Sequence, residues 1–239
     1  MEDIILKCER IEKKYSKTKA LDNINLSIYT GHIYALIGEN GAGKTTLMRI
    51  ISGLIGSDNG KMELKSKNIG ALIEKPAFYP GLTAKENIKI ISLMRSTLIE
   101  KEIVELAMKF GIWENHKKVK NYSLGMKQKL GIILALIGKP QLLVLDEPLN
   151  GLDPKSTIQI RKLLSDLREK GITILISSHI LDELFRVATD YIFISQGTIK
   201  KNFTYEEIVH KYPDKMPEEI YLDILEEWVY VRCYQKRAI

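Results

Sequence analysis

The feature that most restricts the fold of this 239-residue chain is the glycine-rich segment at residues 38–45. It reads Gly-Glu-Asn-Gly-Ala-Gly-Lys-Thr and directly follows an apolar run, residues 33–37, that predicts a buried strand. Residues 46–52 have helical character, so a strand, a tight loop and a helix are expected in that order. In such a loop, successive backbone N–H groups and the positive end of the helix dipole point at phosphate oxygens. The segment therefore predicts binding of ATP or GTP.

Two side chains of this phosphate loop have predicted chemical roles. Lys44 is expected to contact the β- and γ-phosphates, and the Thr45 hydroxyl is expected to bind Mg²⁺. The other residues expected to surround the phosphates are Gly38, Glu39, Asn40, Gly41, Ala42, Gly43 and Thr46.

A pair of acids forms a second nucleotide motif. Asp146 and Glu147 end the apolar run that begins at residue 142. Such a run predicts a buried parallel strand, which would hold both carboxylates at the carboxyl edge of the sheet, where ligands bind. Asp146 is expected to bind Mg²⁺ through a water molecule, and Glu147 to polarise the attacking water.

The order of the other patterns predicts an α/β architecture. β-branched runs alternate with helical patterns, which favours helices layered on a sheet. Strands are predicted at residues 4–8, 24–28, 33–37, 69–73, 142–146, 172–177 and 191–195. Two helical segments interrupt this rhythm, with capping-box sequences beginning at Thr83 and Thr97 and a terminating glycine at Gly111. They predict an inserted helical subdomain at about residues 75–121. The tail after about residue 200 also reads as helical, with a cap at Thr204 and Pro217 in a first turn.

Composition sets limits on location and partners. Lys and Arg number 36 against 30 Asp and Glu, a net charge of +6, but the two signs are mixed along the chain. A solvated surface explains this better than an interface with nucleic acid or with an anionic membrane surface. The most apolar stretch, residues 130–145, is broken by polar residues and proline, so no membrane span is expected. The start of the chain lacks the pattern of a signal peptide, which predicts a cytoplasmic location.

With these motifs in order, about the first two hundred residues resemble an ABC-type ATPase subunit. The resemblance implies that Tyr15 stacks on adenine and that His179 is the switch histidine. It also implies that residues 122–128, with Ser123 and Gly125, form the signature loop that contacts the γ-phosphate held by the opposite subunit. Asp153 belongs to the loop after the catalytic acid. Ser123 and Asp153 are also well suited to cap the helices that follow them.

The resemblance implies a P-loop (RecA-like) core with a β-subdomain, an inserted helical subdomain and a short helical tail. Residues 1–200 would form the ATP-binding domain and residues 201–239 a C-terminal helical extension. The expected catalytic residues are Lys44, Glu147 and His179, and the expected cofactors are ATP and Mg²⁺. The expected partners are a second ATPase subunit, in an ATP sandwich, and a separate transmembrane permease that provides the only membrane contact. No nucleic-acid partner is expected.

Two departures from the family pattern narrow the subgroup. The signature loop carries Leu124 and Met126 where glycine and glutamine are commoner. The family usually has glutamine after the strand that follows the phosphate loop, but this chain has Glu74 there. A carboxylate can still bind Mg²⁺ together with Thr45 and Asp146, while adding negative charge beside the phosphates. With Pro76 and residues 78–87, Glu74 makes the chain similar to the ATPase subunits of bacitracin-resistance and lantibiotic self-protection exporters.

This resemblance favours an Mg²⁺-dependent ATPase that powers export of an antimicrobial peptide, at the inner face of the cell membrane. Three alternatives stay open: an exporter ATPase for another substrate, a soluble ABC-type ATPase acting on nucleic acid or ribosomes, and a nucleotide-binding scaffold without turnover. The last is disfavoured because Lys44, Glu147 and His179 are all present.

Overall fold

Two sheets form the framework of the protein. The computed structural model describes residues 3–66 and 68–235, with side chains up to residue 227. The larger, six-stranded sheet has the order β5-β6-β7-β3-β8-β9, in which only the β8–β9 pair is antiparallel. Its strands are β3 (Ile33–Ile37), β5 (Ile69–Leu72), β6 (Leu142–Leu145), β7 (Thr173–Ser177), β8 (Asp190–Ser195) and β9 (Thr198–Thr204). An antiparallel sheet, β2-β1-β4, consists of β1 (Ile4–Tyr15), β2 (Thr18–Tyr29) and β4 (Asn59–Leu64).

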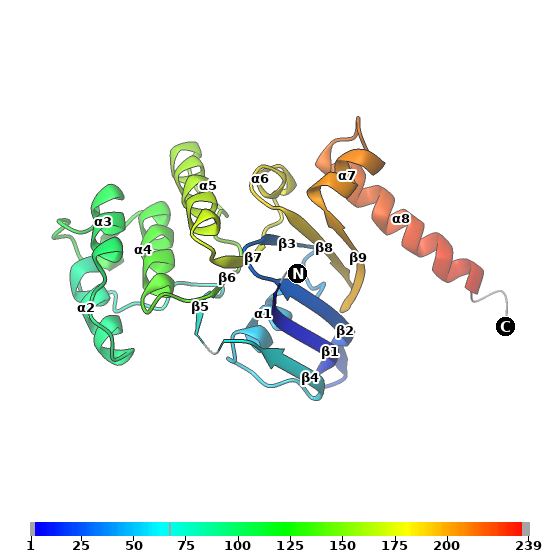
Figure 1. Cartoon of the computed structure of the whole chain (residues 1–239), viewed down its shortest axis with the longest axis horizontal. Coiled ribbons are helices and arrows are strands. Elements are labelled where there is room, and N and C mark those ends of the chain that lie inside the picture. The colour runs from blue at the N-terminus through cyan, green and yellow to red at the C-terminus, as the bar shows by residue number, and fades with distance from the viewer. Residues whose placement is uncertain (1–2, 67, 236–239) are drawn as a thin grey trace.

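The helices gather in groups around this framework (Figure 1). They are α1 (Lys44–Ile51), α2 (Ala84–Met94), α3 (Lys101–Lys109), α4 (Leu124–Leu136), α5 (Pro154–Glu169), α6 (Leu181–Phe185), α7 (Tyr205–Lys211) and α8 (Pro217–Gln235), with a 3₁₀ turn at Val119–Asn121. α4 packs against α2 and α3 at one end of the molecule, while α7 and α8 lie beside β9 at the other end. The predicted α/β class, with its β-subdomain, inserted helices and helical tail, is confirmed.

Strand β3, which leads into the phosphate loop, separates two hydrophobic cores. Ile33, Ala35 and Ile37 belong to the core beneath α5, whereas Tyr34 and Leu36 belong to the core between the two sheets and α1. All five residues are buried, because a central parallel strand is covered on both faces. The alternation follows from the two-residue period of a strand.

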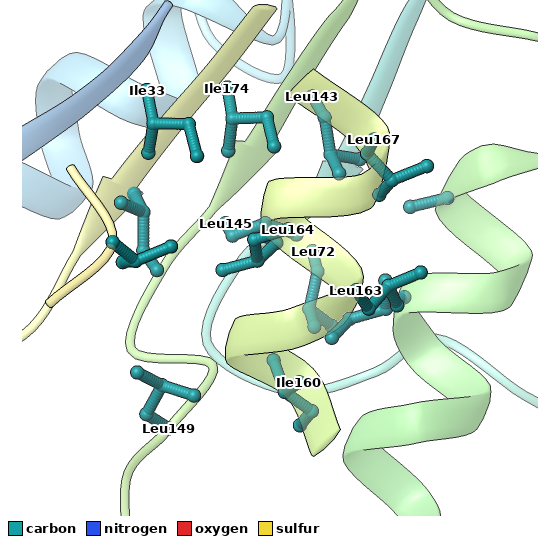
Figure 2. Packing of buried hydrophobic residues seen from close by; sticks show 14 of the residues in the cluster. Ile33, Leu72, Leu143, Leu145, Leu149, Ile160, Leu163, Leu164, Leu167 and Ile174 are labelled. Carbon is teal, nitrogen blue, oxygen red and sulfur yellow. The ribbon is translucent and has the colours of Figure 1, made fainter. Parts of the chain in front are cut away.

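Helix α5 covers one face of the large sheet (Figure 2). Ile160, Leu163, Leu164 and Leu167 recur at the three- and four-residue spacing of a helix face, and all are buried. Figure 2 shows these side chains against those of β6 and β7, including Leu143, Leu145 and Ile174. This packing fixes α5 on the sheet, and with it the loop that precedes the helix.

Three sequence expectations differ from the structure. Strands β4 and β9 were not expected, because most of their residues are exposed or half-buried and their sequences are polar. The capping box at Thr97 is wrong: α3 begins at Lys101, and Glu100 precedes it without a side-chain cap. The Glu100 carboxylate instead accepts a hydrogen bond from the Gly138 backbone N–H at 3.0 Å. The boxes at Thr83 and Thr204 are confirmed, with both of their hydrogen bonds present.

The end of the described chain contributes to the same core as α5. Ile208, Ile220 and Ile224 are buried in it, and β9 crosses the expected boundary between residues 200 and 201. The division into residues 1–200 and 201–239, with a helical subdomain at 75–121, stays a prediction. Within the described ranges, no helix combines the length and the apolar character that a bilayer-spanning segment requires.

Candidate nucleotide site

The phosphate loop joins the buried end of β3 to the start of α1, as the sequence predicts. A Cβ atom at Gly38 would lie 2.3 Å from the Ile194 carbonyl oxygen. At Gly43 it would lie 2.7 Å from the Ala20 carbonyl oxygen, and the φ of Gly43 is +108°. Both positions therefore require glycine. Because Gly43 precedes α1 without a side-chain cap, the first turn of this helix keeps its N–H groups available for an anion.

Lys44 lies inside the loop. Its side chain is buried, and its Nζ donates hydrogen bonds to the carbonyl oxygens of Gly38 at 2.6 Å and Glu39 at 3.1 Å. Burial lowers the pKa of Lys44, while the charges of Glu147 and Asp146 oppose this shift. The ammonium group is thus held at the centre of the loop, where an entering phosphate would compete with the two carbonyls for it.

Asp146 connects the loop to the end of the sheet. It is buried, and its Oδ2 accepts a hydrogen bond from the Thr45 hydroxyl at 2.8 Å. Its Oδ1 accepts from the Ser177 hydroxyl at 2.6 Å, and Ser177 in turn accepts from the Glu147 backbone N–H at 3.0 Å. Sequence reasoning gave Ser177 no role, because its partner is thirty-one residues away. A hydroxyl and a carboxylate oxygen side by side suit Mg²⁺, which prefers oxygen ligands.

Glu147 and His179 form a close pair at the same edge of the sheet. The Nδ1 atom of His179 lies 2.7 Å from Oε2 of Glu147, and the backbone N–H of His179 donates to the same oxygen at 3.3 Å. Glu147 has a φ of +51°, an uncommon conformation for a residue with a side chain. Such conformations persist at functional sites where the surroundings enforce them. The structure therefore brings two of the three predicted catalytic side chains, Glu147 and His179, together.

Glu74 makes a different contact. Its carboxylate Oε1 accepts a hydrogen bond from Arg49 of α1 at 2.7 Å, and its φ is +59°. The Glu74 carboxylate raises the pKa of Arg49, and the hydroxyl of Tyr15 raises it further. Arg49 thus links Glu74 to α1, the helix that follows the phosphate loop. Arg49 could not be recognised from the sequence, because a single arginine inside a helix belongs to no motif.

The residues of the signature loop form a second group. Ser123 is the N-cap of α4, and its hydroxyl accepts a hydrogen bond from the Met126 backbone N–H at 3.3 Å. Asp153 is the N-cap of α5, and its carboxylate accepts hydrogen bonds from the backbone N–H and the hydroxyl of Ser156, at 3.0 Å and 2.7 Å. A Cβ atom at Gly125 would lie 2.7 Å from the Ser156 hydroxyl, so these two helix starts are in close contact. Figure 1 shows α4 well separated from α1.

Most of the predicted site residues therefore fall into two groups. The first contains the phosphate loop, Asp146, Glu147 and His179, and the second contains Ser123, Gly125 and Asp153. Among the described residues, no cluster of three or more His, Cys, Asp or Glu is placed to hold a metal ion.

Comparisons with known proteins point to one family. The family model described as ABC transporter matches residues 21–150. The chain is 41% identical over 204 residues to the lantibiotic transport ATP-binding protein SrtF of Streptococcus pyogenes, covering 82% of this chain and 89% of SrtF. It is 38% identical over 221 residues to the bacitracin transport ATP-binding protein BcrA of Bacillus licheniformis, covering 85% of this chain and 71% of BcrA.

A solved structure agrees with these relatives. An ATP-binding subunit of an ABC transporter matches with a TM-score of 0.81 at 24% identity, covering 92% of this chain and 99% of that one, which shows a shared fold. The matched family segment contains the phosphate loop, the two strand-end acids and the signature residues. With the loop, the acids and the histidine assembled at one sheet edge, the chain belongs to the ATP-binding subunits of the ABC transporter family.

Proposed function

We propose that this chain is an Mg²⁺-dependent ATPase subunit that powers export of a lantibiotic or bacitracin-like peptide, for resistance or self-immunity. The observation that best supports ATP hydrolysis is the pairing of Glu147 with His179 beside the phosphate loop. The peptide class is supported by the 41% and 38% identity to SrtF and BcrA, whose names assign them to lantibiotic and bacitracin transport. Glu74, where the wider family has glutamine, agrees with the same subgroup.

In the proposed mechanism, the loop amides and Lys44 bind the β- and γ-phosphates. Thr45 and Asp146 would hold Mg²⁺, which would neutralise charge on these phosphates. Glu147 accepts a proton from the attacking water, and His179 orients the Glu147 carboxylate through the 2.7 Å contact. Tyr15, which is 44% exposed, would stack on adenine. Glu74, which contacts Arg49 in this structure, would contribute a further oxygen ligand for Mg²⁺.

The separation of the two groups supports a dimer. Ser123, Gly125 and Asp153 lie together at the starts of α4 and α5, away from the α1 of their own chain. In an ATP sandwich they would meet the γ-phosphate bound by the opposite subunit. A separate permease would then convert closure of the dimer into transport, and it would hold the ATPase at the inner face of the membrane.

The test is peptide resistance in cells. Where sequencing of the neighbouring genes identifies a membrane protein, it would be expressed together with the chain in a peptide-sensitive strain. The minimal inhibitory concentrations of a lantibiotic and of bacitracin would then be measured. We expect a severalfold increase that the Glu147→Gln variant does not give. If cells with the wild-type chain are as sensitive as cells with Glu147→Gln, although the purified wild-type chain hydrolyses ATP, peptide export would be contradicted. Copurification of the chain with ribosomes or RNA in place of a membrane protein would favour the soluble alternative.

A further inference from the structure

A tight turn between β8 and β9 contacts the phosphate loop. It consists of Gln196 and Gly197, whose φ angles are +48° and +73°. Ser195 and Thr198 pair across it, so it is a two-residue hairpin turn, in which glycine is favoured at the second position. Gln196 is exposed, whereas Gly197 is buried. The turn therefore directs its glycine towards the interior of the protein.

Gly197 connects the phosphate loop to strand β2 through two backbone hydrogen bonds. Its N–H donates to the carbonyl oxygen of Ala42, in the loop, at 2.9 Å. Its carbonyl oxygen accepts from the N–H of Asp22, in β2, at 2.7 Å. Because Ala42 and Gly197 are both buried, their backbone groups need partners within the protein. The loop backbone is thus held to β2 by way of Gly197.

A β-bulge in β2 fits against this turn. The register of β1 with β2 shifts between residues 13 and 14, which leaves Ala20 as an extra residue in β2. A Cβ atom at Gly197 would lie 2.7 Å from the Ala20 carbonyl oxygen, the same distance as a Cβ atom at Gly43. The bulge, the turn and the loop thus meet through their backbones, and neither glycine position has room for a side chain.

We propose that Gly197 is a positioning residue for the phosphate loop, in which its N–H fixes the peptide group between Ala42 and Gly43. In a planar trans peptide, the carbonyl and the N–H point in opposite directions. Because the turn holds the Ala42 carbonyl, the Gly43 N–H points away from the turn, and the loop can direct it at a phosphate. This role rests on the proposed nucleotide binding, and it extends the site to a turn outside the phosphate-loop motif.

The variant Gly197→Ala tests this role. Its Cβ atom would collide with the Ala20 carbonyl, so the turn must shift away from β2 and its hydrogen bond to the loop is weakened. We expect the Kd for MgATP to rise about 3- to 10-fold, the range for loss of one neutral hydrogen bond. The Kd for magnesium tripolyphosphate should rise by the same factor, because the loop binds the phosphates of both ligands. Calorimetric titration of the purified full chain measures both constants.

A matched control is Gly171→Ala, in the turn between α5 and β7. Gly171 has a φ of +84°, but a Cβ atom there would meet nothing within 4 Å. The control therefore shares the backbone strain without the collision, and we expect it to bind both ligands like the wild type. Thermal melting checks that both variants are folded at the titration temperature. Wild-type affinity in Gly197→Ala, or an equal loss in both variants, would overturn the proposal.

The two ligands separate this role from other effects on the site. A loss confined to MgATP would assign the effect to the adenine side and overturn the role in the phosphate loop. A wild-type chain that binds neither ligand would contradict the proposed nucleotide binding, and with it this role. If the wild type binds both ligands and Gly197→Ala binds them equally well, only the role of the turn is contradicted.

Hydrogen exchange of the wild-type protein tests the contact even if Gly197→Ala does not fold. The Gly197 amide should exchange slowly in the free chain and no faster with MgATP bound, because its hydrogen bond to Ala42 is kept. Nuclear magnetic resonance follows the exchange of this amide in both states. Rapid exchange of the Gly197 amide in the MgATP complex would overturn the proposal.

Discussion

At the scale of single residues, the site depends on two carboxylates, Asp146 and Glu147, that have different hydrogen-bond partners. Asp146 is buried between two hydroxyl donors, whereas Glu147 is paired with an imidazole at a more exposed position. The buried carboxylate has both oxygens engaged and is suited to stay in place. Glu147 contacts the His179 imidazole, which can release it. This suits a carboxylate that must exchange a proton during turnover.

Replacement of Glu147 by glutamine tests its role as base. The amide keeps an oxygen that can accept from the His179 N–H groups but cannot accept a proton from water. We expect hydrolysis to slow by about 10²- to 10⁴-fold with ATP affinity retained. Single-turnover phosphate release and nucleotide binding measure the two quantities. The comparison variant, Lys44→Ala, should abolish turnover. Near wild-type hydrolysis in either variant would remove that residue from the catalytic set.

Glu74 has two candidate duties that substitutions separate. If it binds Mg²⁺, Glu74→Gln keeps an oxygen ligand and should hydrolyse ATP near normally, while Glu74→Ala should need more Mg²⁺. If it also signals to the permease, both variants should lose peptide resistance. Stability should change by less than about 1 kcal/mol, because the Arg49 pair is exposed. ATPase activity across a Mg²⁺ titration is compared with resistance in cells. Full resistance in Glu74→Ala would exclude both duties.

At the scale of elements, α5 links the hydrophobic core to the loop carrying Asp153. Leu164 is fully buried at the centre of its apolar face. Leu164→Ala should lower the free energy of unfolding by about 2–5 kcal/mol, through lost burial and the cavity left behind. On the same helix, Ile158 is 57% exposed, so Ile158→Ala should stay within about 0.5 kcal/mol. Urea unfolding measures both. Similar values for the two variants would show that this helix face is not a major source of stability.

The elements also show what could be predicted from the sequence. A buried strand such as β3 can be recognised from its continuous apolar sequence. The phosphate-loop motif then predicts the local order of strand, loop and helix. Strands β4 and β9 hold their place by pairing with β1 and β8, and their polar sequences give no such signal. The strand-end acids were identified from local patterns. The partners Ser177 and Arg49 were not, because each contact joins segments that only the fold brings together.

At the scale of the whole molecule, the arrangement of the two residue groups predicts assembly. Glu147→Gln with saturating MgATP should form a dimer, because slow hydrolysis traps the state in which each signature loop closes the other site. Light scattering after size-exclusion chromatography measures the mass. Adding Lys44→Ala should return the protein to a monomer, because it removes a contact to the bridging phosphate. A monomeric Glu147→Gln at saturating MgATP would mean that closure requires the permease.

The two-sided burial of β3 has a mechanical consequence. Odd-numbered residues of the strand fill one core and even-numbered residues fill the other. A slip by a single residue would put every side chain into the wrong core, so the strand cannot slide along its neighbours. We therefore expect nucleotide binding to rearrange the loop beyond Ile37 while the register of β3 with its neighbours is kept.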